Sequence, residues 1–82
     1  MFYVYLLIDK NNKKYIGYSS DLRKRINAHL NNKVRTTKHM EKPRLFYYEA
    51  YSSKQEAKER EKKLKHFGSS YHGLLKRLNL KK

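Results

Sequence analysis

The stretch YIGYSSDLRKRINAH, from Tyr15 to His29, decides how this chain folds. Its first three residues are typical of the end of a strand, and Gly17 permits a close backbone approach that a side chain would resist. Ser20 or Asp21 can cap a helix that begins at once. We therefore expect a strand followed directly by a helix that runs from about residue 21 to residue 31.

The predicted helix has an apolar face with chemically active residues at its margin. Leu22, Ile26 and Leu30 recur at every fourth position, which predicts that this face packs on a sheet. At about 100° per residue, Arg25 and His29 lie beside that face, one turn apart. Taken singly, such an arginine is usually a surface charge and such a histidine a structural residue. Their joint placement with a tyrosine toward the sheet is unusual, and it makes these residues candidates for a site.

The size of the chain and its lack of cysteine limit the possible classes of protein. Its 82 residues predict a single domain over residues 1–82, which can bury roughly 60% of the unfolded surface. The absence of cysteine excludes disulfides and cysteine-based zinc sites. The amino-terminal apolar run covers only about eight residues, far fewer than the ~20 that span a bilayer, and no basic segment precedes it. We expect a soluble, cytoplasmic protein with no membrane partner.

Charge is the strongest global signal in the sequence. The chain has 21 lysines and arginines against 7 acidic residues, a formal net charge of +14. A phosphate backbone would relieve this self-repulsion, and the eight tyrosines offer faces on which bases can stack. The alternative is a solvated lysine-rich surface without a specific partner. We expect DNA as the partner, and RNA remains open.

The remaining strands follow from the pattern of apolar residues. Residues 2–8 are continuously apolar, which is typical of a central strand covered on both faces. The polar break over residues 9–14 includes two asparagines and predicts a hairpin. Residues 44–51 predict a third strand. Whether Tyr5 and Tyr15 share a face depends on the register of the hairpin, which the sequence alone leaves open.

The segment NNKVRTTKHMEKP, residues 31–43, is polar and basic and ends at a proline. A stretch this long without regular structure in a small domain is more often functional than accidental. We expect it to contact phosphate, and a solvated loop is the alternative. Its basic residues are Lys33, Arg35, Lys38, His39 and Lys42.

A second helix, after Ser53, places a carboxylate on its inward face. Ala57 and Leu64 define the apolar stripe, and Glu61 lies between them by helical angle. A carboxylate at such a position is costly unless it is paired or binds a cation. An ion pair with Lys65, worth a few tenths of a kcal/mol, is one interpretation. We favour a metal or active-site role for Glu61.

The ends of this helix complete the predicted architecture. Ser53 and Glu56 have the spacing of a capping box, and Gly68 is expected to end the helix. A short third helix should then close the core. The predicted fold class is α/β (α+β), a small three-stranded and mainly antiparallel sheet flanked by helices in the order β-β-α-β-α-α. The apolar residues that predict the third helix are Tyr71, Leu74, Leu75 and Leu78.

Five sequence elements stand in a characteristic order: Tyr3-Val4-Tyr5, Tyr15-Ile16-Gly17, Arg25, His29 and Glu61. This order resembles the GIY-YIG nuclease superfamily, in particular its small stand-alone bacterial-type members. The resemblance covers essentially the whole chain. Tyr3 replaces the first glycine of the name motif, and no asparagine can be assigned to the position that some members use near the carboxyl end.

The resemblance implies a divalent-metal-dependent endonuclease with a GIY-YIG endonuclease-like fold that hydrolyses phosphodiester bonds in DNA. It assigns one Mg²⁺ or Mn²⁺ ion to Glu61 and the phosphate oxygens to Arg25. Tyr15, with Tyr5 or His29 nearby, would orient or deprotonate the water, and the choice between Tyr15 and His29 as the base stays open. The residues expected to bind nucleic acid are Lys33, Arg35, Lys38 and Lys65.

Because no separate recognition domain is visible, structure- or damage-related substrates are expected rather than a specific sequence. A non-catalytic nucleic-acid-binding module with the same fold is the main alternative. Another is a nuclease subunit that depends on a protein partner, and a weak homodimer is also compatible with the sequence.

Overall fold

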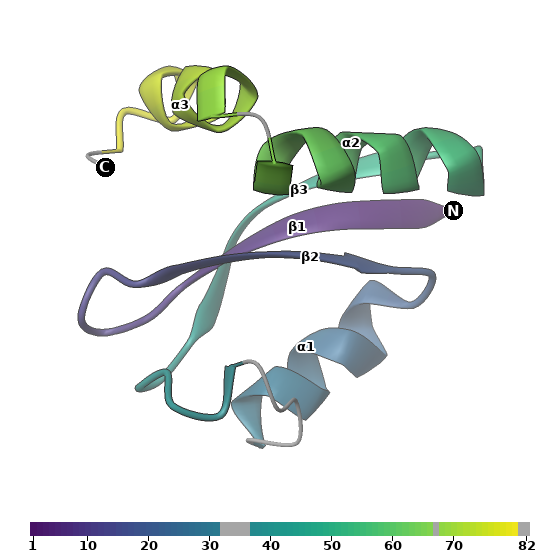
Figure 1. Ribbon diagram of the computed structural model, residues 1–82. Helices are drawn as coiled ribbons and strands as arrows, with labels where there is room; N and C mark the ends of the chain where they lie inside the picture. Colours follow the sequence, from purple (N-terminus) through teal and green to yellow (C-terminus); the bar gives the residue numbers. More distant parts are fainter. Residues whose placement is uncertain (32–36, 67, 81–82) are drawn as a thin grey trace.

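The computed structural model describes residues 1–31, 37–66 and 68–80. Its elements follow the predicted order and antiparallel arrangement, which are thus confirmed (Figure 1). No helix within these described ranges is long and apolar enough to cross a membrane. The elements are β1 (Phe2–Ile8), β2 (Lys14–Ser19), α1 (Leu22–Leu30), β3 (Arg44–Tyr51), α2 (Lys54–His66) and α3 (Gly68–Arg77).

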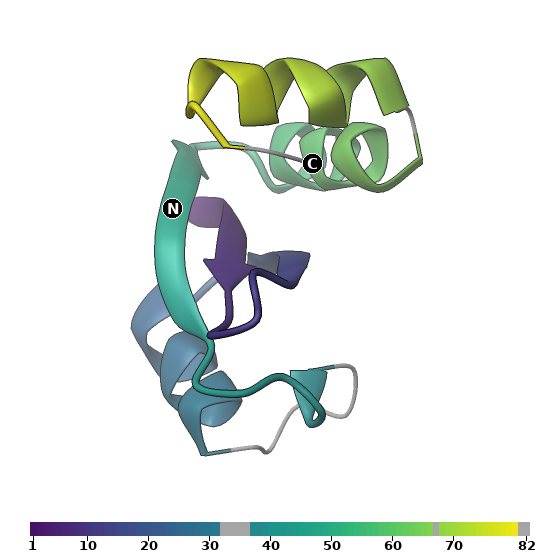
Figure 2. The same cartoon turned by 90° about the vertical axis from the view of Figure 1, so that its left-hand side faces the viewer.

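The three strands form one sheet in the order β2-β1-β3, so β1 is central. Helix α1 covers one face of the sheet, and α2 covers the other with α3 stacked on it (Figures 1 and 2). Both faces of β1 are therefore buried, which is why its sequence is continuously apolar. Val4 and Leu6 belong to the core under α2 and α3, whereas Tyr5 and Leu7 belong to a second core on the α1 side.

The hairpin register answers the question that the sequence left open. Tyr5 pairs with Gly17, and Leu7 pairs with Tyr15. Because alternate residues of a strand share a face, Tyr5 and Tyr15 both point toward α1. The connection turns at Asn12, whose φ of 65° is the left-handed conformation that asparagine tolerates.

Helix α1 begins and ends as its sequence predicts, but one residue of its apolar face was wrong. The Asp21 carboxylate caps the helix by accepting a hydrogen bond from the Lys24 N–H at 3.1 Å. Leu30, which was predicted to face the sheet, is 53% exposed. The last turn instead buries His29, and Leu30 lies about 100° around the helix from it.

Helix α2 buries Ala57 and Leu64 as predicted, and the Ser53 hydroxyl accepts a hydrogen bond from the Glu56 N–H at 3.3 Å. The predicted break near Gly68 is present, because α2 ends at His66 and α3 begins at Gly68. Each of the chain's three glycines lies in a described range, and none has a positive φ. The break at Gly68 is therefore not made by a left-handed glycine.

The described part of the long connection, residues 37–43, is anchored rather than freely solvated. Thr37, Met40 and Pro43 are buried. The Asp9 carboxylate, at the end of β1, accepts a hydrogen bond from the Glu41 N–H at 3.1 Å. Asp9 also accepts hydrogen bonds from two amides of the hairpin turn, so one buried carboxylate joins the hairpin to this segment. Residues 37–43 thus contain no strand or α-helix, as expected, but they are held against the hairpin.

Candidate active site

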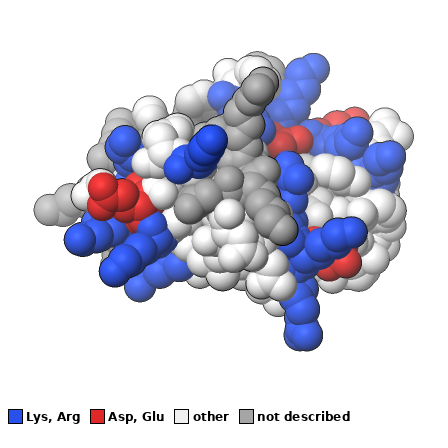
Figure 3. Space-filling view, turned by 90° about the horizontal axis from the view of Figure 1, so that it is seen from below, with Lys and Arg blue, Asp and Glu red and all other residues white. Residues whose placement is uncertain are grey.

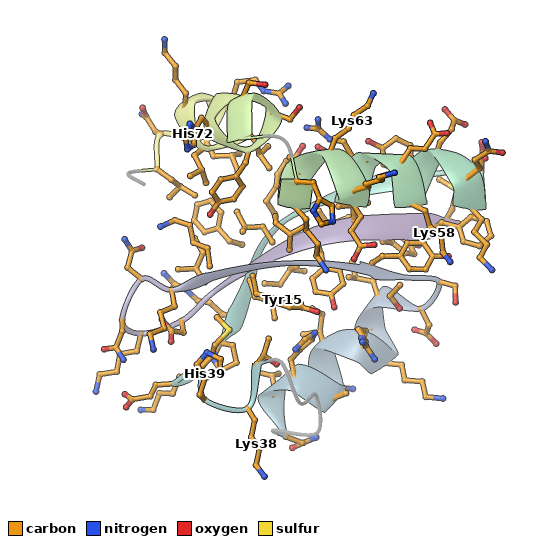
Figure 4. All side chains as sticks on the ribbon, viewed as in Figure 1. Tyr15, Lys38, His39, Lys58, Lys63 and His72 are labelled. Atoms are coloured by element: carbon orange, nitrogen blue, oxygen red, sulfur yellow. The ribbon has the colours of Figure 1, made fainter. Side chains whose placement is uncertain are left out.

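Two tyrosines and a histidine converge between the sheet and α1. The ring centroids of Tyr15 and His29 are 5.3 Å apart, and those of Tyr5 and His29 are 5.6 Å apart. The Tyr5 hydroxyl is hydrogen-bonded to Nε2 of His29 at 2.7 Å. Tyr15 points from β2 toward α1 (Figure 4). Three residues from separate elements thus form one aromatic and polar cluster.

Gly17 makes room for this cluster. A Cβ on Gly17 would overlap Cζ and Oη of Tyr5, and it would lie 2.9 Å from Cε2 of Tyr15. Tyr5 is almost fully buried, so its ring cannot move aside into solvent. The requirement for glycine at this strand position therefore comes from the two tyrosines on the same face, not from backbone strain.

His29 is anchored by a residue that the sequence reasoning missed. Its Nδ1 is hydrogen-bonded to Oγ1 of Thr37 at 2.6 Å, and both side chains are fully buried. A neutral imidazole has one donor and one acceptor nitrogen, so one hydroxyl donates to the ring and the ring donates to the other. No periodicity marks Thr37, because it lies in an irregular segment eight residues beyond His29.

The electrostatics of the cluster favour neutral side chains. Burial raises the pKa of Tyr5 to about 12, although the Arg25 guanidinium nearby opposes part of this rise. Burial also lowers the pKa of His29, and the positive charge of Arg25 lowers it further. Arg25 therefore acts on both groups, even though its own side chain is exposed. At neutral pH, Tyr5 keeps its proton and His29 is an uncharged imidazole.

Glu61 approaches the same cluster from α2. Its Oε2 forms an ion pair with Nζ of Lys65 at 3.1 Å, the pairing that the sequence offered as one interpretation. The negative charge of Glu61 also contributes to the raised pKa of Tyr5. Lys65 Nζ lies 5.5 Å from the ring centroid of Tyr15, so this lysine joins α2 to β2. Lys65, predicted to bind nucleic acid, is thus part of the candidate site.

Glu61 is the one residue near this cluster that the sequence predicted to bind a metal. Among residues 1–31, 37–66 and 68–80, no group of three or more His, Asp or Glu residues is arranged to hold a metal ion. The Glu61 side chain is 24% exposed, which leaves it accessible to solvent. A hard cation such as Mg²⁺ accepts one protein carboxylate together with waters and a phosphate. The donor chemistry of the site therefore fits one such ion.

Of the other predicted nucleic-acid-binding residues, the structure describes Lys38, which lies on the α1 side of the molecule. Lys38 is exposed, and Figure 4 shows it and His39 on the segment after α1. Lys33 and Arg35 lie outside the described residues. Basic side chains far outnumber acidic ones on this face (Figure 3). A groove of about 740 Å³ includes Lys10, Lys38, Lys42 and Arg44 in its lining, with Glu41 among them.

Comparisons with known proteins place this geometry in a family. Residues 1–74 match the GIY-YIG catalytic domain. The solution structure of the UPF0213 protein BH0048 from Bacillus halodurans is similar, with 34% sequence identity and a TM-score of 0.58. That likeness covers 95% of this chain and 85% of the Bacillus halodurans chain. No curated protein gives a significant match.

Proposed function

Because this chain belongs to the GIY-YIG family, we propose that it is a divalent-metal-dependent endonuclease that hydrolyses phosphodiester bonds in DNA. One observation carries the proposal: Tyr5, Tyr15 and His29 form one cluster, and the charges of Arg25 and Glu61 both act on Tyr5. Phosphodiester hydrolysis needs a group that orients or deprotonates the attacking water, a cation that binds the phosphate and a carboxylate that binds a metal. The cluster and its charged neighbours provide all three. These residues are Tyr5, Tyr15, Arg25, His29 and Glu61.

Tyr15 is the best-placed group to contact the attacking water. It is partly exposed on an edge strand, whereas Tyr5 and His29 are buried. Both ring nitrogens of His29 already have hydroxyl partners. A base must come within hydrogen-bond reach of the proton that it removes. The sequence left the choice between Tyr15 and His29 open. We therefore propose that Tyr15, not His29, contacts the attacking water.

Tyr5, His29 and Thr37 would then position Tyr15. The chain of hydrogen bonds from Tyr5 through His29 to Thr37 fixes the orientation of the imidazole, whose ring lies against Tyr15. Fully satisfied buried networks of this kind restrict side chains to one arrangement. Their role in this proposal is to hold the phenol of Tyr15 and not to exchange protons with solvent.

Arg25 and Glu61 would bind the substrate phosphate and the metal. The exposed guanidinium of Arg25 offers planar donors for two phosphate oxygens. Glu61 would hold the ion, and Lys65 neutralises its charge when no cation is bound. A bound Mg²⁺ or Mn²⁺ would act as a Lewis acid on the phosphate.

The charge of the protein supports a nucleic acid as the substrate. Within that class we propose DNA, and branched or damaged DNA rather than a specific sequence. A net charge of +14 provides strong, sequence-independent attraction to phosphate. Lys38 and the predicted contacts Lys33 and Arg35 would bind the backbone outside the site.

The experiment that tests this function is a cleavage assay on supercoiled plasmid and on branched DNA, with Mg²⁺, Mn²⁺ or EDTA. We expect cleavage that depends on the metal and is lost in Tyr15→Phe. Tyr18→Phe is the matched control, because Tyr18 is on the same strand but packs on the opposite face of the sheet. Equal rates for the two variants would contradict the assignment of Tyr15.

One observation favours a second candidate, a nucleic-acid-binding module without turnover. The Glu61–Lys65 ion pair accounts for the carboxylate without any metal. Under this alternative the protein binds DNA with a steep dependence on salt but leaves every substrate intact in each metal. If the wild-type protein shows metal-dependent cleavage that is lost in Tyr15→Phe, the binding module without turnover is excluded.

A further inference from the structure

A second groove lies on the opposite side of α1 from the candidate active site. It has a volume of about 470 Å³, within the range of small-ligand sites. Its aromatic walls are Tyr3 and Tyr48, whose ring centroids are 6.0 Å apart in an edge-to-face arrangement. Tyr48 is 52% exposed, so its ring is accessible to a ligand. The other lining residues are Ser20, Asp21, Leu22, Arg23, Ile26, Asn27 and Leu45.

The helical period explains how α1 contributes residues to both the groove and the candidate active site. Leu22 and Ile26 form the row that packs toward the sheet. At about 100° per residue, Arg25 and His29 lie on one flank of this row. Arg23 and Asn27 lie on the other flank and line the groove. Because a helix with its side chains is about 10–12 Å wide, the two places are separated by only a few nucleotide steps.

We propose that this groove binds an unpaired base of the nucleic acid while the phosphate to be cut lies at the candidate active site across α1. The location of the cut rests on the proposed nuclease function, whereas the binding of the base does not. The proposal names the substrate class as nucleic acid with a single-stranded stretch next to the cleavage point. A fully paired duplex has no base available for the groove.

The chemistry of the groove favours a nucleotide. Tyrosine rings provide faces for stacking, a contact that any base can make. The exposed amide of Asn27 can hydrogen-bond the polar edge of a base, and the exposed Arg23 can contact its phosphate. The one acidic lining residue, Asp21, is engaged as the helix cap.

The charge of the protein argues against a second copy of the chain as the occupant. Two molecules that each carry +14 repel one another, whereas a polyanion is attracted. Strand β3 is at the edge of the sheet, where a partner strand could add, but that pairing would not use the tyrosine faces. A base, by contrast, uses the aromatic, amide and guanidinium groups together.

The test measures binding of an oligonucleotide that carries the fluorescent base 2-aminopurine, in EDTA so that no cleavage occurs. We compare a single strand with the matching duplex. Tyr48→Ala should weaken single-strand binding about tenfold, the effect of losing one stacked base, and reduce the quenching of 2-aminopurine. Phe46→Ala is the matched control, because Phe46 is a 41% exposed aromatic residue of the same strand and does not line the groove.

Two further measurements decide the outcome. Tyr48→Trp should restore single-strand affinity and quenching, and duplex binding should change less than twofold in every variant. Equal effects of Tyr48→Ala and Phe46→Ala, or equal losses for single strand and duplex, would overturn the proposal. A wild-type dimer that Tyr48→Ala dissociates without weakening DNA binding would overturn it too. Since the assay needs no turnover, failure of the nuclease function would leave its result intact.

Discussion

Two carboxylates lie near opposite edges of the sheet, and neighbouring residues of α2 determine their surroundings. Arg60 reaches toward β3, where its Nε and Nη2 donate to Glu49 at 2.9 and 3.1 Å. The next residue, Glu61, pairs with Lys65, whose ammonium group lies 5.5 Å from the ring centroid of Tyr15 on β2. Glu49 also accepts hydrogen bonds from Tyr47 and Tyr51, at 2.7 and 2.6 Å.

The two carboxylates differ in how many of their oxygens already have hydrogen-bond partners. Burial alone would raise the pKa of Glu49, but its hydrogen bonds from Arg60 and the two tyrosines keep that pKa below its usual value. Both oxygens of Glu49 are occupied, so it has a structural role. Glu61 is held by one flexible ammonium group and is more exposed, 24% against 13% for the Glu49 side chain. An ion can displace a lysine from a carboxylate far more easily than a guanidinium fork and two phenols.

The largest expected effect comes from replacing each carboxylate by its amide. Glu61→Gln should lower the cleavage rate at least about 100-fold, because a metal contributes several kcal/mol to the transition state. Its fold should be unchanged, since the amide has nearly the same shape. Glu49→Gln should cleave normally but lose about 1–3 kcal/mol of unfolding free energy, because buried donors are left without an acceptor. Cleavage kinetics and urea unfolding measure the two effects.

Metal-free DNA binding sharpens the same comparison. Glu61→Gln should bind DNA as tightly as the wild type or more tightly, because a negative charge facing the phosphate is removed. Glu59→Gln is a suitable control, as Glu59 is exposed on the opposite side of α2. Wild-type cleavage by a normally folded Glu61→Gln variant would contradict the metal assignment.

The two arginines permit a parallel test with a smaller effect. Arg25→Lys should keep most DNA binding but lose cleavage about 100-fold, because a point charge cannot reproduce the two-pronged contact with phosphate. Arg60→Lys should cleave at the wild-type rate and lose about 1.5 kcal/mol of stability, the contribution of one charge-assisted hydrogen bond. If Arg25→Lys cleaves normally, Arg25 is only an electrostatic contact.

Substitution of Gly17 tests whether the candidate site is packed so closely that it cannot accept an added Cβ. Gly17→Ala should lower the free energy of unfolding by about 1–3 kcal/mol, the usual cost of overpacking, because the new Cβ would collide with the buried Tyr5. Gly73→Ala is the control in α3, where a Cβ meets no atom within 4 Å. That change should instead stabilise the protein by about 1 kcal/mol through helix propensity. Thermal or urea unfolding distinguishes the two, and equal changes would contradict the packing argument.

The fold could be predicted from the sequence because its signals are local and periodic. The apolar run of residues 2–8 predicts the central strand, and the cap at Asp21 and the row of Leu22 and Ile26 predict α1. Leu30 was misplaced because periodicity does not show where a helix leaves the sheet. The roles of the site residues stay predictions, although the structure brings Tyr5, Tyr15 and His29 together.

The partners of these residues could not be predicted, because they come from contacts between distant segments. The hydrogen bond from His29 to Thr37 depends on how an irregular segment folds back on α1. The bidentate contact of Arg60 with Glu49 joins a helix to an edge strand and to a residue 11 positions earlier in the chain. Neither contact leaves a spacing pattern in the sequence.

The smallest expected effect is a difference in the pH ranges over which the two regions lose stability. Burial and Arg25 lower the pKa of His29 in the folded state, so the unfolded chain binds a proton first as the pH falls. The contribution of His29 is therefore complete above its unfolded pKa of about 6.5 and declines below it. The pKa of Glu49 is also lowered, so its contribution declines only below about pH 4.3. Thermal unfolding between pH 7 and 5 should show a fall that His29→Gln reduces and Glu49→Gln does not. A midpoint that is constant over this range in the wild type would contradict a buried, neutral His29.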